Sequence, residues 1–578
     1  MTLSFSQLLW QTSEFQNEQE QITRLCNSLQ ISSAFAKILI NRNLSEVGDV
    51  EQFLNPSSVQ CHDPFLMRDM KKAVERIYSA LMRREKVSIY GDYDADGTAG
   101  TVILYKYFKR IGMRVHYFIP ERLKDGYGMS EETLKTLKRK NVDLIITVDN
   151  GITAISEALI LKKLGMELII TDHHQVISET PVACAILNPQ QPQCSYPFKG
   201  LCGTGVAYKL LIAFDHFLTE QNYWELSGYI RPDLNRDLDL VAFATVADRV
   251  PLVDENRFFV KAGLKIINSA PRPGLQKLMK ECNIRRRVTP NVISFKLAPK
   301  INAVGRLSDP NTGVNLLLAH SLSEARPFAS RLIQVNTERQ QIERKVFNAA
   351  LALAKAQKDQ SLIILIDDYW HSGVIGSVAA KIAGRFRKPT VILTLFHEKQ
   401  AMGSIRSVGD FDVCNALRNC EELLDKFGGH KAAAGLSLDA VNVKDFCHQF
   451  RTKFESGQLD APRSGNDALT IDAWINPMTL KEGLVEELIS MAPFGTQNPE
   501  PILAMENTKI KNLMVIGNQH LKFDVNTSEL DMEVFAWDHF DWYTQLGGTC
   551  DIAMTLQMNS ISKKYPLQFK AIDMKQSS

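Results

Sequence analysis

The chain has 578 residues, of which 45% are hydrophobic and 23% are charged, and its formal net charge is +2. This composition is typical of a soluble globular protein with roughly two to four domains. A nearly neutral charge excludes a globally basic surface, so any nucleic acid would have to be bound by a local groove. The ten cysteines include no CxxC pair, which argues against structural zinc and against a disulfide framework.

Neither a targeting signal nor a membrane span is predicted. The N-terminus, MTLSFSQLLWQTSEFQNEQE, is polar and soon becomes acidic, unlike a secretory signal peptide. The longest apolar runs, such as SLIILI, are far shorter than the roughly 20 residues of a membrane-spanning helix. We therefore expect a cytoplasmic protein that does not enter a membrane.

Residues 1–50 form a predicted helical extension, for which the sequence indicates no role. From residue 51 to residue 322, short β-branched runs alternate with amphipathic helical segments, and these runs include VSIY, DLIITVD and ELIITD. The alternation predicts an α/β domain with a parallel sheet and crossover helices. In such sheets, ligands bind beyond the carboxyl ends of the strands.

Residues 323–357 contain one early proline and no glycine, and they are rich in Arg, Gln, Glu and Ala. This composition predicts one long helix of about 30 residues that connects two domains. Two shorter helices packed against each other remain an alternative.

Two further domains are predicted after this helix. Residues 358–457 repeat the strand–helix–strand pattern and indicate a second, smaller α/β domain. A polar stretch, SGQLDAPRSGND, separates this domain from residues 465–575, where about five short segments alternate apolar and polar residues. We expect these segments to form a β-barrel of the oligonucleotide-binding type, although a generic β-sandwich would fit the same pattern.

Acidic residues follow several predicted strands of the first α/β domain. YGDYDADG places three aspartates after VSIY, TVDNG ends the next run with one, and TDHHQ contains one aspartate and two histidines. A further aspartate lies in ATVADRVPL, at the predicted end of a helix. A single acidic cluster is usually a solvated loop, but here separate segments direct ligands to one edge of one sheet. The candidate ligands are Asp92, Asp94, Asp96, Asp149, Asp172, His173, His174 and Asp248.

These side-chain types predict a centre for divalent metal ions. Carboxylates combined with imidazole suit Mn²⁺ or Mg²⁺, and the absence of a thiolate among the candidates disfavours zinc. The candidates are too many for one ion, so we expect a pair, which in other enzymes activates water for in-line attack on phosphorus. Alternation along an extended segment is expected to direct Asp94 and Asp96 to the same side.

A nucleoside-triphosphate motor is disfavoured because the sequence contains no GxxxxGK[ST] motif. The segment CGTGVAY has only two glycines, so the start of a helix explains it better than a phosphate-binding loop does. Tyr93, Tyr127, Phe523 and Trp537 are candidates for stacking on bases, although core packing explains them equally well.

The acidic motifs resemble those of the DHH phosphoesterase superfamily. GDYDADGTAG, TVDNG, TDHHQ and ATVADRVPL stand in its order and spacing. Further motifs resemble its single-strand-specific exonucleases, and they are LAPKINAVGRL, WHSGVIGSVAAKI, GSIRS, FGGHKAAAG and PFGTQNPEP. The resemblance spans about residues 50–505.

The resemblance implies a DHH domain joined by the long helix to a smaller domain, with the active site between them, and a C-terminal barrel of the oligonucleotide-binding type. It also implies an activity, namely 5′-to-3′ exonuclease degradation of single-stranded DNA to 5′-mononucleotides in recombination and repair. The cofactors would be Mn²⁺ or Mg²⁺, with two ions in each active site.

The resemblance also assigns roles to the candidate ligands. It implies metal binding by Asp92, Asp94, Asp96, Asp149, His173 and Asp248. It implies a catalytic set of Asp94, Asp149, His173, His174 and Asp248. Within that set, His174 would contact the scissile phosphate or a metal, and Asp172 would orient the imidazoles from outside the set.

Cationic and small polar residues near these motifs are candidates for phosphate binding, because a guanidinium group matches phosphate oxygens with two hydrogen bonds. We expect Arg122, Ser404 and Arg406 to bind the terminal 5′ phosphate. Arg306 and His371 would contact the phosphates beside the scissile bond, and a surface ion pair is the alternative for each arginine. The complete set of substrate-binding candidates is Arg122, Arg306, His371, Ser404, Arg406 and His430.

Two other functions fit parts of the pattern. The first is a phosphoesterase that acts on pyrophosphate or on short oligonucleotides, which the predicted barrel disfavours. The second is a DNA-binding scaffold without activity, which the intact ligand set disfavours. The resemblance further suggests a monomer that acts on single-stranded DNA beside a single-strand-binding protein and a helicase, away from any membrane.

Overall fold

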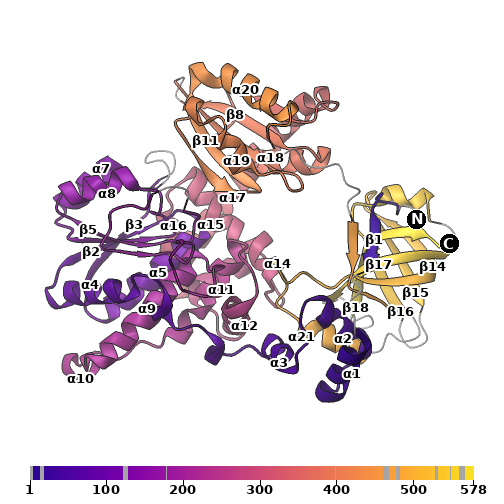
Figure 1. Ribbon diagram of the computed structural model, residues 1–578, viewed down its shortest axis with the longest axis horizontal. Helices are drawn as coiled ribbons and strands as arrows, with labels where there is room; N and C mark the ends of the chain where they lie inside the picture. The colour runs from indigo at the N-terminus through magenta and orange to yellow at the C-terminus, as the bar shows by residue number, and fades with distance from the viewer. Residues whose placement is uncertain are drawn as a thin grey trace.

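The computed structural model describes residues 4–12, 18–121, 128–176, 179–396, 399–459, 468–476, 482–526, 531–546, 549–558 and 567–577. Figure 1 shows three bodies, with the first α/β domain in indigo to magenta, the second domain in orange above it, and the barrel in yellow at the right. The predicted fold class is confirmed in each of these bodies.

The first α/β domain contains a parallel sheet whose described strands run in the order β3-β2-β4-β5-β6. The strands are β2 (Lys86–Gly91), β3 (Arg114–Phe118), β4 (Leu144–Val148), β5 (Glu167–Thr171) and β6 (Ala185–Leu187). All residues of β4 are buried, as expected for a strand that is covered on both faces. The order reverses between β2 and β4, and a position of this kind is where doubly wound sheets bind ligands.

Helices cover both faces of this sheet. Alternate strand residues contribute to two separate cores, since Ile146 packs in one and Ile145 in the other. The larger core holds side chains of α4 (Met70–Met82), α5 (Ala95–Arg110), α9 (Gly203–Glu220), α11 (Leu238–Ala247) and α12 (Asp254–Ser269). The smaller core holds side chains of α7 (Glu131–Arg139) and α8 (Ile155–Lys163). Shorter helices complete the domain, namely α10 (Tyr223–Ser227), α13 (Pro273–Glu281), α14 (Pro290–Val292), α15 (Ala298–Leu307) and α16 (Asn311–Leu318).

The long connecting helix is confirmed as a single element, α17 (Leu322–Ala356), and the two-helix alternative is wrong. The Ser321 side chain caps its N-terminus by accepting a hydrogen bond from the Glu324 backbone. Ala329 and Leu332 pack in the core of the first domain, whereas Ala350 and Ala354 pack in the core of the second. One helix therefore links the two hydrophobic cores.

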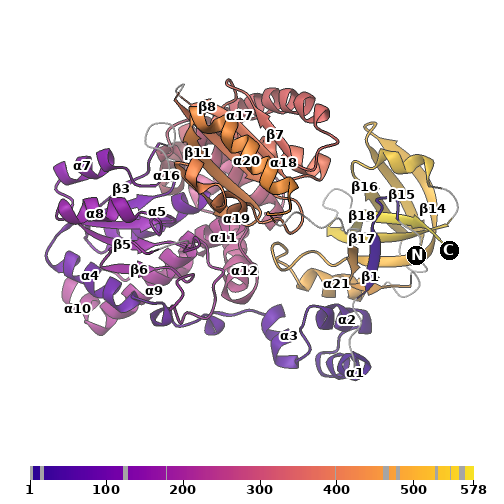
Figure 2. The same ribbon diagram turned by 45° about the horizontal axis from the view of Figure 1, so that its top comes forward.

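The second domain contains a mixed sheet in the order β10-β11-β9-β8-β7. Its strands are β7 (Ile363–Ile366), β8 (Thr390–Phe396), β9 (Gln400–Arg406), β10 (Lys426–His430) and β11 (Ala433–Asp439). Its helices are α18 (Ser372–Phe386), α19 (Val413–Arg418) and α20 (Val443–Glu455). Only the β7–β8 pair is parallel among these described strands. Figure 2 shows this domain turned toward the viewer above the first domain.

The C-terminal region forms a closed five-stranded barrel, and the sandwich alternative is wrong. Neighbouring strands pair in the order β14-β15-β16-β18-β17, and β17 pairs with β14 to close the ring. The barrel strands are β14 (Leu503–Ile516), β15 (His520–Asn526), β16 (Asp531–Ala536), β17 (Thr549–Met558) and β18 (Leu567–Gln576). A short strand, β13 (Ala473–Trp474), pairs in parallel with β14. Closure removes the exposed edges that an open sheet would present.

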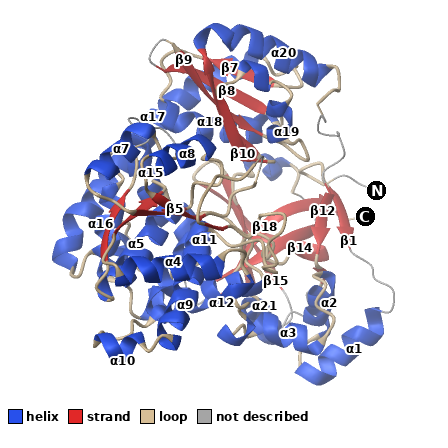
Figure 3. Ribbon diagram, turned by 60° about the vertical axis from the view of Figure 1, so that its left-hand side comes forward, coloured by secondary structure: helices blue, strands red, loops and turns tan. Residues whose placement is uncertain are grey.

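The N-terminal segment packs on this barrel, which the sequence did not indicate. β1 (Leu9–Thr12) pairs in parallel with β12 (Ala468–Ile471), although about 460 positions separate them. The helices α1 (Glu18–Leu29), α2 (Ser33–Asn41) and α3 (Val47–Leu54) share one hydrophobic core with α21 (Glu482–Ser490) and the barrel strands. Figure 3 shows these helices gathered beside the barrel. We call the described residues 4–54 and 468–577 the barrel module.

The described helices include none that is both long enough and apolar enough to cross a membrane.

Candidate metal centre and phosphate pocket

Three of the candidate acids lie just beyond the ends of adjacent parallel strands. The backbone N–H of Asp92 donates to the Val148 carbonyl at 3.1 Å, and that of Asp149 donates to the Thr171 carbonyl at 3.0 Å. In the same way, the N–H of Asp172 donates to Leu187 at 3.0 Å. Each acid therefore continues the hydrogen bonding of its strand by one residue, and this fixes all three at one edge of the sheet.

Asp94 and Asp96 belong to a helix start. The predicted extended conformation holds for Asp94, the N-cap of α5, but it is wrong for Asp96, because the helix begins at Ala95. Asp94 accepts hydrogen bonds from the backbone N–H groups of Asp96 at 2.9 Å and Gly97 at 3.0 Å. A helix N-terminus favours carboxylates because its first N–H groups lack partners within the helix.

The N-terminus of a second helix, α9, supports Asp96. The Asp96 carboxylate accepts hydrogen bonds from the backbone N–H groups of Gly203 and Thr204, each at 2.7 Å. The segment CGTGVAY is thus a helix start, as expected, but its N–H groups bind a carboxylate of the centre. The side chain of Cys202 caps this helix, and burial raises the pKa of its thiol well above the usual value.

Asp149 combines a strained backbone with close packing. Its φ of +63° lies in the left-handed region, which costs energy for a residue other than glycine and is often found at functional sites. The α9 backbone approaches it closely at Gly203, where an added Cβ would lie 2.6 Å from the Asp149 Cβ. Gly203 is therefore required for the packing of α9 against Asp149.

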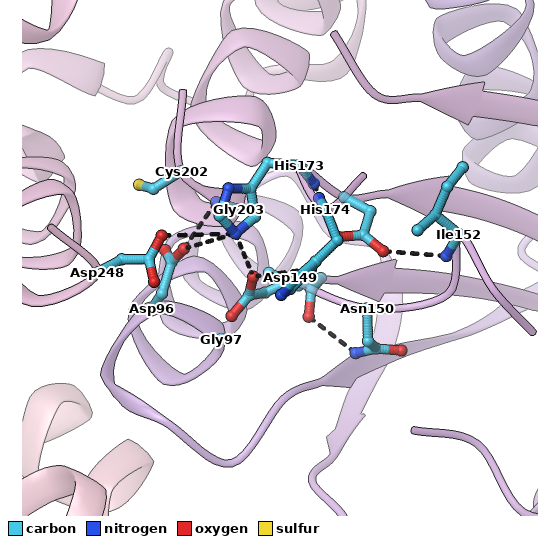
Figure 4. Close-up of polar contacts among 12 residues, drawn as sticks. Asp96, Gly97, Asp149, Asn150, Ile152, His173, His174, Cys202, Gly203 and Asp248 are labelled. Carbon is cyan, nitrogen blue, oxygen red and sulfur yellow. Dashed lines mark hydrogen bonds and ion pairs between the residues drawn. The ribbon is translucent and has the colours of Figure 1, made fainter. Parts of the chain in front are cut away.

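His173 lies at the middle of the carboxylate cluster, as Figure 4 shows. Its Nε2 is 3.1 Å from Asp149 Oδ1, 3.5 Å from Asp248 Oδ2 and 3.9 Å from Asp96 Oδ2. Asp248 follows the last residue of α11, which confirms its predicted place at the end of a helix. Four separate chain segments therefore meet at one imidazole, and the predicted convergence is confirmed for these residues.

His174 is oriented by Asp172. Its Nδ1 lies 2.7 Å from Asp172 Oδ1, and the other oxygen of Asp172 accepts a hydrogen bond from the Ile152 N–H at 2.9 Å. Burial alone would lower the pKa of His174, but the Asp172 carboxylate raises it to about 10. The His174 ring stacks on that of His430, with centroids 5.9 Å apart, so the second domain reaches the metal centre here.

The residues present fit divalent metal ions. Ligand atoms within 4.8 Å of one another form three overlapping groups, namely Asp92–Asp94–Asp149, Asp96–His173–Asp248 and Asp149–His173–His174. The Oδ1 atom of Asp149 is buried and accepts no hydrogen bond within the described part of the chain. Burial, followed by repulsion from Asp96, raises the pKa values of Asp94, Asp149 and Asp248. Cations at this position would relieve that repulsion.

A small pocket between the first and second domains contains three predicted phosphate-binding residues. Its volume is about 210 Å³, and its lining includes Arg306, Ser404 and Arg406 together with glycines of β10, β11 and α18. The Arg406 Nη1 donates to Ser404 Oγ at 2.7 Å. Burial and the nearby charge of Arg306 lower the pKa of Arg406 to about 10. Two guanidinium groups that line one pocket favour the binding of an anion there.

The pocket adjoins the metal centre through α15. Gly305 packs against the loop that carries the first aspartates, since an added Cβ would lie 2.3 Å from the Tyr93 carbonyl oxygen. The next residue, Arg306, lines the pocket. His371 caps α18 by accepting a hydrogen bond from the Gly373 N–H at 3.0 Å, and Gly373 also lines the pocket. Arg122 lies outside the described residues.

Sequence reasoning missed several residues that support the site. Asn302 accepts a hydrogen bond from the Ala95 N–H at 2.8 Å and so fixes the start of α5. It lies in the motif KINAVGRL, in which the sequence indicated a binding role only for Arg306. Gly203 and Thr204 were missed because a helix start gives no signal of what its N–H groups bind.

Family models match three parts of the chain. They are described as the DHH family, N-terminal domain, over residues 86–244, the DHHA1 domain over residues 359–456, and the RecJ OB domain over residues 471–573. Together with the parallel sheet and its buried carboxylate cluster, these matches define a metal-dependent phosphoesterase of the DHH class.

Full-length relatives narrow this class. The chain is 33% identical to the single-stranded-DNA-specific exonuclease RecJ of Escherichia coli (strain K12), over 78% of this chain and 80% of that protein. It is 35% identical to the protein of the same name from Bacillus subtilis (strain 168), over 89% of this chain. The chain belongs to the RecJ family. The matched region spans 64% of the length of the Bacillus subtilis relative.

Solved structures agree with this assignment. The structure of RecJ from Thermus thermophilus in complex with Mn²⁺ matches 99% of this chain and 80% of that chain, with a TM-score of 0.82 and 26% identity. The structure of the same protein in complex with Mg²⁺ has a TM-score of 0.76 and 25% identity. The similarity therefore extends over all the bodies described above.

Proposed function

We propose that the chain is a single-stranded-DNA-specific exonuclease that degrades DNA in the 5′-to-3′ direction, releases 5′-mononucleotides and acts in recombination and repair. The observation that carries the proposal is the buried carboxylate–imidazole cluster beside a pocket that contains two guanidinium groups. Family membership supports the same activity, because the curated relatives are named single-stranded-DNA-specific exonucleases.

Two divalent cations, Mn²⁺ or Mg²⁺, are the proposed cofactors. When bound, such ions neutralise charge on a phosphodiester and make water more acidic. The proposed ligands are those that converge at the sheet edge, namely Asp92, Asp94, Asp96, Asp149, His173 and Asp248. The Thermus thermophilus relative was crystallised with each of these metals, which supports the choice.

The pocket would bind the 5′ end of the strand. At about 210 Å³ it is smaller than typical pockets for whole ligands, so it suits a phosphate group better than a nucleotide. Arg406 and Ser404 would hold the terminal phosphate, and Arg306 would contact the phosphate nearer the metal centre. Anchoring the terminus while the neighbouring bond is hydrolysed explains an exonuclease rather than an endonuclease.

His174 and His430 would contact the phosphate that reacts. The Asp172 carboxylate, 2.7 Å from His174 Nδ1, orients this imidazole and raises its pKa. His430 stacks on it from the second domain, so both rings lie beside the ligand cluster. Their proposed role is to orient the phosphate and to stabilise its charge.

The barrel would bind the strand farther from the terminus. Trp537 is 38% exposed, and its ring stacks on Phe535 at a centroid distance of 5.4 Å. Phe535 is half-buried and supports the exposed Trp537 ring, which suits base stacking. Phe523 and Tyr93 are buried and serve in packing, whereas Tyr127 lies outside the described residues.

We also propose that the chain acts as a monomer in the cytoplasm, beside a single-strand-binding protein and a helicase. These two partners rest on the sequence resemblance described above. Light scattering during size-exclusion chromatography tests the monomer, and a second species at twice the mass would contradict it.

Degradation of a 40-nucleotide strand with labels at either end tests the function. We expect release of labelled mononucleotide from the 5′ end first, no hydrolysis of pyrophosphate, and loss of activity in excess chelator. Arg406→Lys should reduce the rate by about 10- to 100-fold on a 5′-phosphorylated strand, because lysine cannot form the two parallel hydrogen bonds.

Two comparisons complete this test. Arg385→Lys, at an exposed position on α18, should leave the rate unchanged. An Arg406→Lys variant as active as the unmodified protein would show that the pocket does not bind the terminus. Hydrolysis of pyrophosphate in place of DNA would favour the small-molecule phosphoesterase, and binding without degradation would favour the scaffold.

A further inference from the structure

The ligand Asp248 is held differently from the other acids. Asp92, Asp149 and Asp172 are fixed by hydrogen bonds between neighbouring strands, whereas Asp248 lies where α11 ends and a connecting segment begins. Its side chain is 27% exposed, compared with 4% for Asp149. The next residue, Arg249, has a φ of +58°, so the chain turns sharply away from the helix immediately after the ligand. The Asp248 N–H donates to the Ala244 carbonyl at 2.9 Å, so α11 holds this ligand from one side and the segment that follows holds it from the other.

A loop of the barrel module contacts this segment directly. Thr496 Oγ1 donates to the Arg249 carbonyl at 2.7 Å, and the Leu252 N–H donates to the Thr496 carbonyl at 2.8 Å. Gly495 packs against the Leu252 side chain, where an added Cβ would lie 2.6 Å from Leu252 Cδ1. Two hydrogen bonds and a close apolar contact therefore connect the barrel module to the residues after Asp248.

The contacting loop is itself rigidly built. Gly495 and Asn498 exchange backbone hydrogen bonds of 2.8 and 3.0 Å. The Asn498 side chain is buried and donates to the carbonyls of Met491 at 3.0 Å and Pro493 at 2.8 Å. Arg42, the C-cap of α2, donates to Asn498 Oδ1 at 2.9 Å, so the N-terminal helices help to fix this loop.

A second contact holds the two bodies together near the same place. Arg257 of α12 is 2% exposed, and its guanidinium lies 3.7 Å from the centre of the Phe53 ring. It donates to the carbonyls of Phe53, Met491 and Ala492, all in the barrel module. The Nε and Nη2 groups of this buried guanidinium therefore fix the module against α12, close to the loop that contacts Arg249.

We propose that Thr496 is a positioning residue for the metal ligand Asp248, so that metal affinity depends on the docked barrel module. The hydroxyl of Thr496 holds the Arg249 carbonyl, and this contact fixes the turn that presents the Asp248 carboxylate. The inference rests on the metal centre of the proposed function and assigns the barrel module a role besides binding DNA. It also gives the N-terminal helices a role, because Arg42 supports the same loop.

Mn²⁺ binding by the metal-free, full-length protein, measured by calorimetry without DNA, tests the proposal. Thr496→Val removes the hydroxyl donor and keeps the side-chain shape, and it should weaken Mn²⁺ binding at the affected ion by about 10-fold. Thr496→Ser keeps the donor and should bind Mn²⁺ as the unmodified protein does. At saturating Mn²⁺, the turnover of Thr496→Val should return close to the unmodified value.

A matched control is Thr508→Val, because the hydroxyl of Thr508 is bonded within the barrel, to the Glu506 carbonyl. It should not change Mn²⁺ binding. In an Asp248→Asn background, Thr496→Val should have no further effect, since its influence passes through Asp248. An additive loss in that background, or unchanged Mn²⁺ binding in Thr496→Val, would overturn the proposal.

The experiment distinguishes failure of the positioning role of Thr496 from failure of the proposed exonuclease function. An unmodified protein that binds Mn²⁺ but does not degrade DNA would contradict the exonuclease and leave the affinity comparison valid. Unchanged Mn²⁺ binding in Thr496→Val, in a protein that degrades DNA, would contradict only the positioning role.

Discussion

Buried like charges set the energetics of individual residues in the metal centre. Asp94, Asp149 and Asp248 have raised pKa values, first because they are buried and then because Asp96 lies close by. Asp149 adds a backbone in the left-handed region. In the absence of cations, each of these features lowers the free energy of unfolding. The same features form a site that can bind metal.

Asp149→Asn should separate these two properties. The amide carries no charge, and asparagine tolerates the left-handed region well, so the metal-free variant should unfold at a higher temperature. We expect a gain of about 0.5–2 kcal/mol, and an increase in melting temperature of about 2–4 °C for each kcal/mol. The same change removes a metal ligand, so activity should fall by more than about 10²-fold.

Calorimetry with and without Mn²⁺ checks this prediction. The unmodified protein should be stabilised by Mn²⁺ through mass action, and the variant should respond much less. An Asp149→Asn variant that degrades DNA at the unmodified rate would show that the cluster performs no chemistry.

At the scale of elements, the N-terminus of α9 is as important as the strand ends. Its first N–H groups bind the Asp96 carboxylate, and its backbone packs against Asp149 at Gly203. The approach is possible only because no side chain intervenes. A helix that supplies no metal ligand thereby fixes the position of two.

Gly203→Ala should therefore impair the centre. The new Cβ would lie 2.6 Å from the Asp149 Cβ, so α9 or Asp149 must shift. A displacement of about 1 Å at a reactive centre costs on the order of 10²-fold in rate. Steady-state degradation rates at saturating Mn²⁺ measure the effect.

Gly205→Ala is the control on the same helix. Its new Cβ would meet a Leu201 methyl group at 3.3 Å, a contact that a flexible side chain relieves. The two variants should differ widely in rate. Equal rates would show that α9 does not position Asp149.

The sequence predicted the positions of the strand ends better than it predicted the helix start or the contacts between distant segments. Acids after β-branched runs correctly predicted the sheet edge, because parallel strands share the direction of their carboxyl ends. The alternation argument failed at Asp94 and Asp96, because a capping aspartate starts a helix there and local pattern did not distinguish the two. Asn302 and Thr496 were missed because they act through contacts with residues distant in sequence.

At the scale of the whole molecule, the barrel module is assembled from both ends of the described chain. β1 pairs with β12, and helices α1 to α3 share a core with the barrel strands. The connecting helix α17 joins the other two bodies through their cores. Because β1 and β12 are distant in sequence, no local pattern predicts their pairing. This is why the sequence alone indicated no role for the N-terminal segment.

Phe35→Ala should destabilise the barrel module selectively. Phe35 is fully buried in the shared core, and truncation of a buried phenylalanine costs about 3–5 kcal/mol. We expect calorimetry to resolve two unfolding transitions, one for the barrel module and one for the domain that binds Mn²⁺. Phe35→Ala should lower the temperature of the barrel-module transition, which Mn²⁺ does not shift directly. Leu137→Ala, in the core around α7 and α8, should instead lower the transition that Mn²⁺ raises.

The opposite effect of Phe35→Ala on the two transitions would contradict the core that the N-terminal helices share with the barrel. If Phe35→Ala lowered only the Mn²⁺-sensitive transition, the N-terminal helices would belong energetically to the first α/β domain.

The β1–β12 pairing has a consequence for biosynthesis. Residues 9–12 are translated about 460 positions before their partner strand, an interval of roughly 20 to 90 seconds at common elongation rates. During that interval both α/β domains can fold. The apolar faces of helices α1 to α3 stay exposed to solvent, because the barrel strands that cover them are not yet translated. We therefore expect chaperones to bind nascent chains at helices α1 to α3 until β12 and the barrel strands have been translated.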